Sequence, residues 1–184
     1  MMKRTVLTAL VGVLAWVAWV GPTHAQRGKV SFDDAMKLVQ KCRVDDLRAM
    51  FMGAAMGAAT TDAAIAASNA TILDPSTVKS SDGTPLVVAT AETDCVEGMR
   101  VLINSGAELS DTDKDGRTAL HAAAAMSTSN MVQLLVEHKA DVNAKTKAGD
   151  TPLSLAKTNN YKGKTDQRDK IVKFLMSKGA KDKS

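Results

Sequence analysis

The chain has 184 residues, of which 45% are hydrophobic but only 3% aromatic, and its formal net charge is +4. A chain of this length can bury one modest core, built here mainly from Ala, Leu, Val and Met because aromatic side chains are so few. The weak positive charge does not support a nucleic-acid binder, which needs Lys and Arg clustered on one face.

The N-terminal segment, 1–25, has the layout of a secretory signal peptide. A positive pair, Lys3-Arg4, precedes an uncharged apolar run at 5–20, and small residues precede the expected cleavage site after Ala25. The apolar run is shorter than the roughly 20 residues that a spanning helix needs, so we interpret it as a signal rather than a membrane anchor. We therefore expect a periplasmic or secreted product without a stable membrane anchor, with 22 basic and 20 acidic residues left and a net charge of +2.

The segment after the signal, 26–57, predicts an N-terminal capping pair of helices at about 32–41 and 44–57. Its apolar residues recur at helical spacing on one face of each helix. These residues are Ala35, Met36, Leu38, Val39, Val44, Leu47, Met50 and Phe51. An insertion rich in Ala, Ser and Thr follows at 58–78, either as a packed extension of the cap or as a loop over a binding face.

Three segments that follow share one template in the same order. Each begins with a Gly followed within two residues by Thr and then, two residues later, by Leu: Gly83-Thr84-Pro85-Leu86, Gly116-Arg117-Thr118-Ala119-Leu120 and Gly149-Asp150-Thr151-Pro152-Leu153. The predicted second helix ends at Gly106, Lys139 and Gly179, respectively. Gly106 and Lys139 lie one period of about 33 residues apart. The interval from Lys139 to Gly179 is longer, so the last segment carries an insertion. The three predicted repeats are 79–112, 113–145 and 146–181.

The residues at the start of each repeat have a physical reason to be there. Thr84, Thr118 and Thr151 stand where a side-chain oxygen can cap the first amides of a helix. Pro85 and Pro152 follow at the first helical position, where the missing N–H is not needed. Each repeat is therefore predicted to begin with a short capped helix.

The ends of the repeats are equally informative. Gly106 and Gly179 are expected to end the second helix in a left-handed turn, which Gly adopts without strain. Lys139 replaces Gly at the equivalent point, at a cost of about 1 kcal/mol. The link into the next repeat is expected to be an extended, hairpin-like finger.

These residues resemble the ankyrin repeat, which has a period of about 33 residues and a Thr-Pro-Leu-His signature. The best copy covers 113–145, and the resemblance extends well over 79–181 and loosely over 32–54. It implies an all-α solenoid of stacked helix-turn-helix units with short hairpin fingers. A single unit cannot bury its own apolar face, so the units must stack.

The resemblance also implies that the concave surface, formed by finger tips and inner helices, binds another protein. The mixture of positive and negative charge at these positions favours a protein surface over a polyanion. We expect a monomer that binds an exported enzyme or another envelope protein. The predicted partner-binding residues are Lys114, Asp115, Arg117, Ala125, Met126, Lys147, Ala148, Asp150, Thr158 and Asn159, together with Ser80 and Ser81.

No pattern in the sequence indicates catalysis, a metal or a cofactor, and we predict that the protein is not an enzyme. His121 occupies the signature position, where the resemblance implies that its ring ties the turn together by hydrogen bonds. His138 is expected to be a solvated surface residue. Asp111, Asp113 and Asp115 alternate as in a calcium loop, but the Glu that such a loop needs is absent.

Cys42 and Cys95 fall at comparable points, between the two helices of the cap and of the next repeat. Packed helices lie about 8–10 Å apart, whereas a disulfide needs Cα atoms within about 7 Å. The sequence leaves a bridge and two buried free thiols as alternatives.

The function predicted is a non-catalytic protein–protein interaction module of the cell envelope. The alternative is a binder of an envelope ligand, such as a cell-wall or lipid fragment, that uses the insertion at 54–74. Ankyrin-like arrays serve many partners, so the fold alone does not name the partner.

Overall fold

The computed structural model describes four segments of the chain, and it describes the repeats almost completely. Residues 1–30, 53–73, 127, 159–164 and 184 lie outside the description, and they include the predicted signal peptide (1–25), the predicted end of the second capping helix (53–57) and most of the predicted insertion. The described segments are residues 31–52, 74–126, 128–158 and 165–183.

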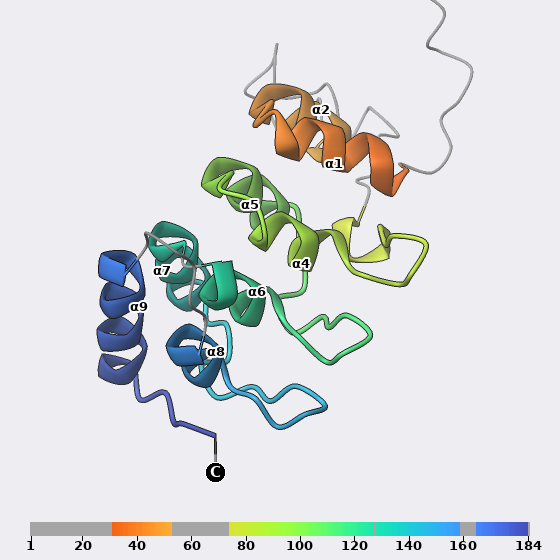
Figure 1. The fold of residues 1–184 in the computed structure, drawn as a ribbon. Coiled ribbons are helices and arrows are strands. Elements are labelled where there is room, and N and C mark those ends of the chain that lie inside the picture. Colours follow the sequence, from red (N-terminus) through yellow and green to blue (C-terminus); the bar gives the residue numbers. More distant parts are fainter. Residues whose placement is uncertain (1–30, 53–73, 127, 159–164, 184) are drawn as a thin grey trace, which may run out of the picture.

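The described residues form a stack of helix pairs in two layers (Figure 1). Helices α1, α4, α6 and α8 contact one another in chain order and form the inner layer, while α2, α5, α7 and α9 form the outer layer. Within this part of the chain the only β pairing is an isolated bridge between Lys79 and Pro85. The helices are α1 (Phe32–Gln40), α2 (Val44–Met52), the 3-10 turn η2 (Pro75–Thr77), α4 (Leu86–Ala91), α5 (Val96–Asn104), α6 (Ala119–Met126), α7 (Ser129–Glu137), α8 (Pro152–Thr158) and α9 (Thr165–Ser177).

This arrangement confirms the all-helical solenoid predicted from the repeats. The helices are short, between 6 and 13 residues, so their stability comes from tertiary packing rather than from helix propensity. None of the described helices is both long and apolar enough to cross a membrane.

The core divides into two clusters along the stack. The larger cluster joins α4 to α9, and in α6 it consists largely of alanines that are at most 1% exposed, which lets neighbouring inner helices approach closely. The smaller cluster joins the capping pair to α4 and α5. The described aromatic residues contribute only Phe51 as a fully buried side chain, as the composition predicts.

The capping pair forms where the sequence predicts it, as α1 and α2, while the predicted continuation of the second helix to residue 57 lies outside the described residues. Ala35, Val39, Leu47 and Phe51 are buried, and the other predicted apolar residues are partly buried against the same cluster. Ser31 caps α1 by accepting a hydrogen bond from the Asp34 amide. The amphipathic pattern was therefore sufficient to orient both helices.

The prediction for the helix starts is right in the last repeat and wrong in the first. Thr151 caps α8: its hydroxyl accepts from the Ser154 amide at 3.2 Å, and the Ser154 hydroxyl accepts from the Thr151 amide at 2.9 Å. Thr84 does not cap α4, because Pro85 occupies the cap position and makes no side-chain cap. Thr118 hydrogen-bonds to the ring of His121 instead.

The error at Thr84 is one of register. The finger glycines Gly83, Gly116 and Gly149 are evenly spaced, each one repeat period after the last. In this register Thr84 corresponds to Arg117, not to Thr118, so it belongs to the finger rather than to the helix cap. The match of Thr84-Pro85-Leu86 to Thr151-Pro152-Leu153 therefore places the start of the first repeat one residue out of register with the finger glycines.

The left-handed turns after the outer helices are confirmed. Gly106 and Gly179 have φ values of +93° and +82°, and Lys139 adopts the same region at +65°. At Lys139 the amide donates to the Val136 carbonyl and the next amide donates to the Leu135 carbonyl, which is the Schellman pattern of helix ends. Lys139 therefore holds a conformation that Gly adopts without strain.

Candidate functional site

The three fingers repeat one turn. In each, the first residue donates its amide to the carbonyl of the fifth, and a Gly in the left-handed region donates back to the first. The side-chain oxygen of the first residue accepts from the amide of the fifth: Ser80 at 3.0 Å, Asp113 at 2.9 Å and Thr146 at 3.0 Å. We call these turns finger 1 (80–84), finger 2 (113–117) and finger 3 (146–150).

Fingers 2 and 3 are held together. The Lys147 amide donates to the Asp115 carbonyl at 2.9 Å. A Cβ added at Gly116 would lie 2.9 Å from the Lys147 backbone nitrogen, so only Gly fits there at this approach. The two finger tips consequently form one continuous surface of fixed spacing.

An ion network anchors finger 2 to the preceding repeat. The Asp113 side chain is only 2% exposed, and it accepts from Arg117 Nε at 2.7 Å and from the Asp115 amide at 2.9 Å. Arg117 also contacts Glu92 Oε1, at the end of α4, at 3.2 Å. Burial opposes ionisation of Asp113, but the hydrogen bonds from Arg117 and Asp115 outweigh it and hold its pKa below the ordinary value.

His121 links finger 2 to finger 3 through the core. Its side chain is fully buried; Nδ1 lies 3.2 Å from the Thr118 amide nitrogen, and Nε2 lies 3.1 Å from the Asp150 carbonyl. Because the amide can only donate, Nδ1 is the acceptor, so Nε2 carries the proton and donates to Asp150. Burial lowers the pKa of His121 and keeps the ring neutral. The structural role implied by the signature position is confirmed.

The last repeat is completed by the C-terminal residues. The Lys181 amide donates to Asn143 Oδ1 at 2.7 Å, and the Thr151 hydroxyl donates to the Lys181 carbonyl at 2.9 Å. The Lys183 ammonium contacts Asp150 Oδ1 at 2.8 Å. The residues after α9 thus contact the base of finger 3 and the Asn143 side chain that precedes it.

The predicted partner-binding residues fall into two groups in the structure. Those at the tips and at the end of α8 are exposed: Lys114, Asp115, Lys147, Ala148 and Thr158. Ala125 and Met126, at the end of α6, and Asp150, at the base of finger 3, are half-buried, and Asn159 lies outside the described residues. The exposed tips and the end of α6 form what we call the finger face.

Arg117 has a structural role that the sequence analysis did not predict. Its guanidinium pairs with two carboxylates of this chain, so it ties two repeats together instead of standing free at the tip. The signal for one pairing was present, since Asp113 lies close before Arg117 in the same finger. The pairing with Glu92, which belongs to the preceding repeat, could not be read from a local pattern.

The described residues contain no group of three or more His, Cys, Asp or Glu side chains that could hold a metal ion. Of the alternating residues Asp111, Asp113 and Asp115, Asp113 forms an ion pair with Arg117. His138 is exposed at the end of α7, as expected.

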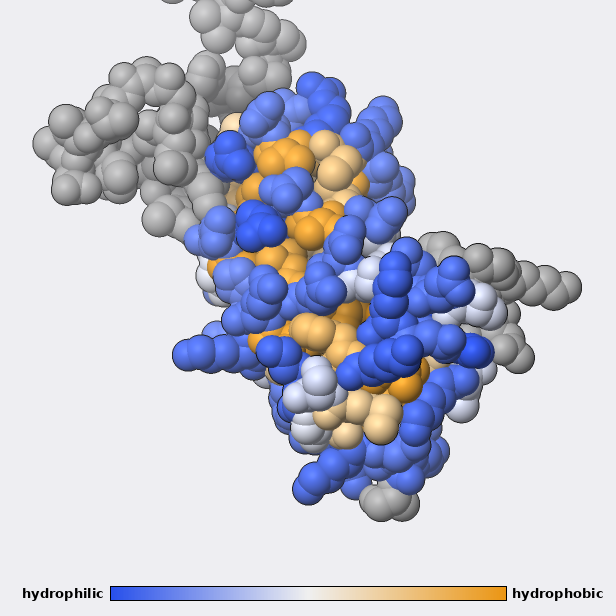
Figure 2. Space-filling view, turned by 90° about the vertical axis from the view of Figure 1, so that its left-hand side faces the viewer, coloured by the Kyte–Doolittle hydropathy of each residue, from blue (hydrophilic) through white to orange (hydrophobic). Residues whose placement is uncertain are grey.

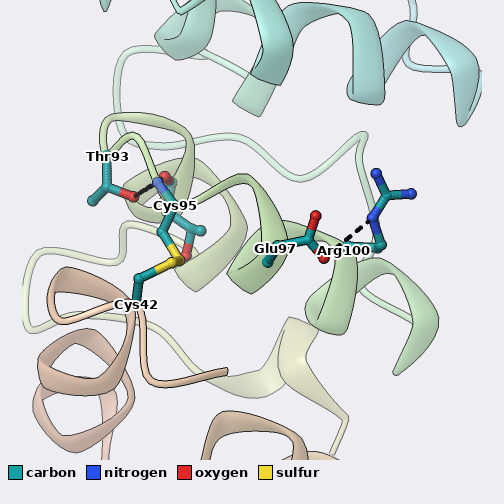
Figure 3. Close-up of a disulfide and its surroundings, with 6 residues drawn as sticks. Cys42, Thr93, Cys95, Glu97 and Arg100 are labelled. Atoms are coloured by element: carbon teal, nitrogen blue, oxygen red, sulfur yellow. Dashed lines mark hydrogen bonds and ion pairs between the residues drawn. A yellow bond between two sulfur atoms is a disulfide. The ribbon is translucent and has the colours of Figure 1, made fainter. Parts of the chain in front are cut away.

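A shallow hollow of about 340 Å³ lies on the outer face, between α5 and α7. Figure 2 looks onto this side of the stack and shows a largely hydrophilic surface with apolar strips. The hollow includes Glu97 and Arg100, which pair with each other at 3.5 Å (Figure 3). None of the predicted partner-binding residues lines it; its lining is Val96, Glu97, Arg100, Asn130, Gln133, Leu134 and Glu137.

Cys42 and Cys95 form a disulfide that joins the turn between α1 and α2 to the turn before α5 (Figure 3). Their Cα atoms lie 5.5 Å apart, closer than the packing distance expected for neighbouring helices. The turns approach more closely than the helix axes do, which is why a bridge fits here.

The comparison with protein families agrees with this geometry. A family model described as "Ankyrin repeats (3 copies)" matches residues 37–146 and, in an overlapping register, residues 86–184. The two matches together run from α1 to the C-terminal end of the chain. The chain therefore belongs to the ankyrin-repeat family, whose members generally mediate protein–protein interaction and are typically non-catalytic.

Individual relatives share only the repeat region. The chain is 44% identical over 81 residues to ankyrin repeat and SOCS box protein 16 of Homo sapiens (43% of this chain, 17% of that protein). It is 38% identical over 68 residues to a putative ankyrin repeat protein of Rickettsia felis (36% of this chain, 18% of that protein). A match to serine/threonine-protein kinase 12 of Arabidopsis thaliana is 42% identical over 59 residues (32% of this chain) but covers only 13% of that kinase. The chain thus spans less than a fifth of the length of these relatives.

Proposed function

We propose that this protein is an exported, non-catalytic module of the cell envelope that holds a partner protein on its finger face. The observation that carries the proposal is the rigid pairing of fingers 2 and 3 through the Lys147 amide and the Asp115 carbonyl. A binding surface whose elements are fixed before contact loses less entropy when the partner binds.

The chemistry of the finger face suits a protein partner. Lys114 and Asp115 on finger 2 and Lys147 on finger 3 are exposed, and Met126, the last residue of α6, is half-buried. A protein surface can match both signs of charge, and methionine adapts to irregular apolar contacts. The mixture of positive and negative side chains favours a protein surface over a polyanion.

Export is supported by two independent features. The N-terminal sequence has the layout of a signal peptide, and the Cys42–Cys95 disulfide belongs to the oxidising compartments outside the cytosol. Intact-mass measurement on protein recovered from the periplasm or medium tests this. A mature chain beginning at Gln26 is the expected result, and a chain retained in the cytosol with segment 1–25 still attached would overturn the proposal.

The binding experiment has two stages. Envelope extract is passed over the immobilised protein, a captured protein is identified and purified, and its dissociation constant is then measured by calorimetry. The combined variant Lys114→Glu/Lys147→Glu/Met126→Asp should weaken binding at least ~10-fold, because it reverses two charges and buries a third at the interface.

The matched control reverses two exposed lysines on the outer helix α9, Lys170 and Lys173. This control should leave the dissociation constant unchanged. Equal binding by the finger-face variant and the wild type would refute the site. Arg117→Glu is unsuitable as a test, because it would place a carboxylate against the buried Asp113 and disturb the fold itself.

A further inference from the structure

Cys42 stands where the backbone favours Gly. Its φ is +47°, and the turn is closed by the Cys42 amide donating to Val39 and the Arg43 amide donating to Leu38, both at 2.9 Å. This is the Schellman pattern, in which the left-handed position is usually Gly. A Cys there is unfavourable for the turn itself, so the bridge is the role that its side chain serves.

The other half of the bridge is enclosed. Cys95 precedes α5 and is only 5% exposed, whereas Cys42 is exposed. A Cβ added at Gly98 would lie 2.9 Å from Cys95 Sγ and 3.6 Å from Leu47 Cδ2, so the missing side chain makes room for both the sulfur and helix α2. The two cysteine residues of the bridge, shown in Figure 3, thus differ in their exposure to solvent.

The bridge fastens the part of the stack with the smallest core. The capping pair consists of two nine-residue helices and contacts the rest of the described chain mainly through α4 and α5. Its apolar contacts belong to a cluster separate from the one that joins α4 to α9. The cap can therefore leave without opening the larger core, and helices this short are not stable alone.

We propose that the Cys42–Cys95 disulfide is a thiol–disulfide exchange site for a dithiol reductant, and that its reduction releases the capping pair from the stack. The thiolate of the reductant attacks Sγ of Cys42, the more exposed of the two residues, the Sγ–Sγ bond breaks, and Cys95 leaves as a thiolate that takes up a proton.

The second thiol of the reductant then attacks the reductant's own sulfur in the mixed disulfide, and the bond from that sulfur to Cys42 Sγ breaks. Cys42 is released as a thiol, and the reductant becomes a disulfide. The protein gains two electrons and two protons, and the dithiol loses the same. Release of the cap uncovers the apolar end of the stack formed by Leu86, Val101 and Leu102, which the cap buries in the oxidised protein.

Hydrogen exchange of the full chain, purified with its disulfide intact, tests the release. After treatment with dithiothreitol, amides in α1 and α2 should exchange at least ~100-fold faster, because the bridge joins positions separated by 53 in the sequence. Amides in α6 and α7 should change less than about 3-fold, since they belong to the other cluster. Unchanged exchange in α1 and α2, or equal acceleration in all helices, would overturn the proposal.

The variant Cys42→Gly provides the matched control. It removes the sulfur but places the favoured residue in the left-handed turn, so α1 keeps its end. Untreated Cys42→Gly should exchange like the reduced wild type, and dithiothreitol should add nothing. Exchange like the oxidised wild type would show that the bridge does not hold the cap.

The direction of attack is tested separately. A brief reaction with a monothiol such as 2-mercaptoethanol, followed by alkylation and peptide mass analysis, should find the adduct on Cys42 and the alkylated thiol on Cys95. The reverse distribution would overturn the assignment of Cys42 as the attacked sulfur.

Discussion

The buried carboxylate of Asp113 offers the sharpest test of what holds the fingers in place. Its Oδ1 accepts from the amides of Asp115 and Arg117, and its Oδ2 accepts from Arg117 Nε at 2.7 Å. In Asp113→Asn the amide oxygen can keep both backbone hydrogen bonds, but the NH₂ group then faces the Arg117 N–H. The substitution therefore removes one charge-assisted bond and sets two donors against each other.

The magnitude follows from the exposure of the two partners. A hydrogen bond to a charged group contributes about 1.5–3 kcal/mol. The Arg117 side chain is 36% exposed, so water can hydrogen-bond to its guanidinium in the variant and offset part of this loss. We expect Asp113→Asn to lower the free energy of unfolding by about 2 kcal/mol, which corresponds to roughly 4–8 °C in Tm for a domain of this size.

Urea unfolding followed by circular dichroism measures this change, with Asp82→Asn as the control. Asp82 is an exposed finger carboxylate whose pKa is lowered to about 2 by hydrogen bonds from the Ser80 hydroxyl and the Thr84 amide. Water can replace these hydrogen bonds because Asp82 is exposed, so Asp82→Asn should lower the free energy of unfolding much less than Asp113→Asn does. If the two variants unfold at the same urea concentration, burial of Asp113 does not stabilise the finger and the reasoning fails.

Three further predictions follow from the turns and the buried ring. In urea unfolding, Gly116→Ala should lower the free energy of unfolding more than Gly83→Ala does. Both glycines have positive φ, but of the two only Gly116 lies against a neighbouring finger. An equal loss of stability in the two variants would contradict the effect of that contact. Lys139→Gly should raise the free energy of unfolding by about 1 kcal/mol by relieving the left-handed strain, and a lower Tm would contradict it. His121 has a pKa lowered by burial, so the unfolded state binds the proton first, and stability should be full above pH about 6.5 and fall as the pH drops below it. His121→Gln should show a shallower loss between pH 7 and 5, and an unchanged slope would show that another group titrates there.

The sequence by itself determined the repeating unit, the orientation of the helices and the left-handed turns. These are local properties: apolar residues at helical spacing choose the buried face, and Gly106, Lys139 and Gly179 mark positions where the chain must turn with positive φ. Even the misplaced cap at Thr84 was an error of one position within a correctly recognised repeat.

Only the tertiary structure decided which residues meet across repeats. Arg117 pairs with Glu92 over a sequence separation of 25, the His121 ring reaches the Asp150 carbonyl over 29, and Cys42 joins Cys95 over 53. Each contact depends on how closely one unit packs on the next, and turns can approach more closely than helix axes do. A sequence pattern carries the spacing of residues along the chain, whereas these contacts are set by the distance between units in the stack.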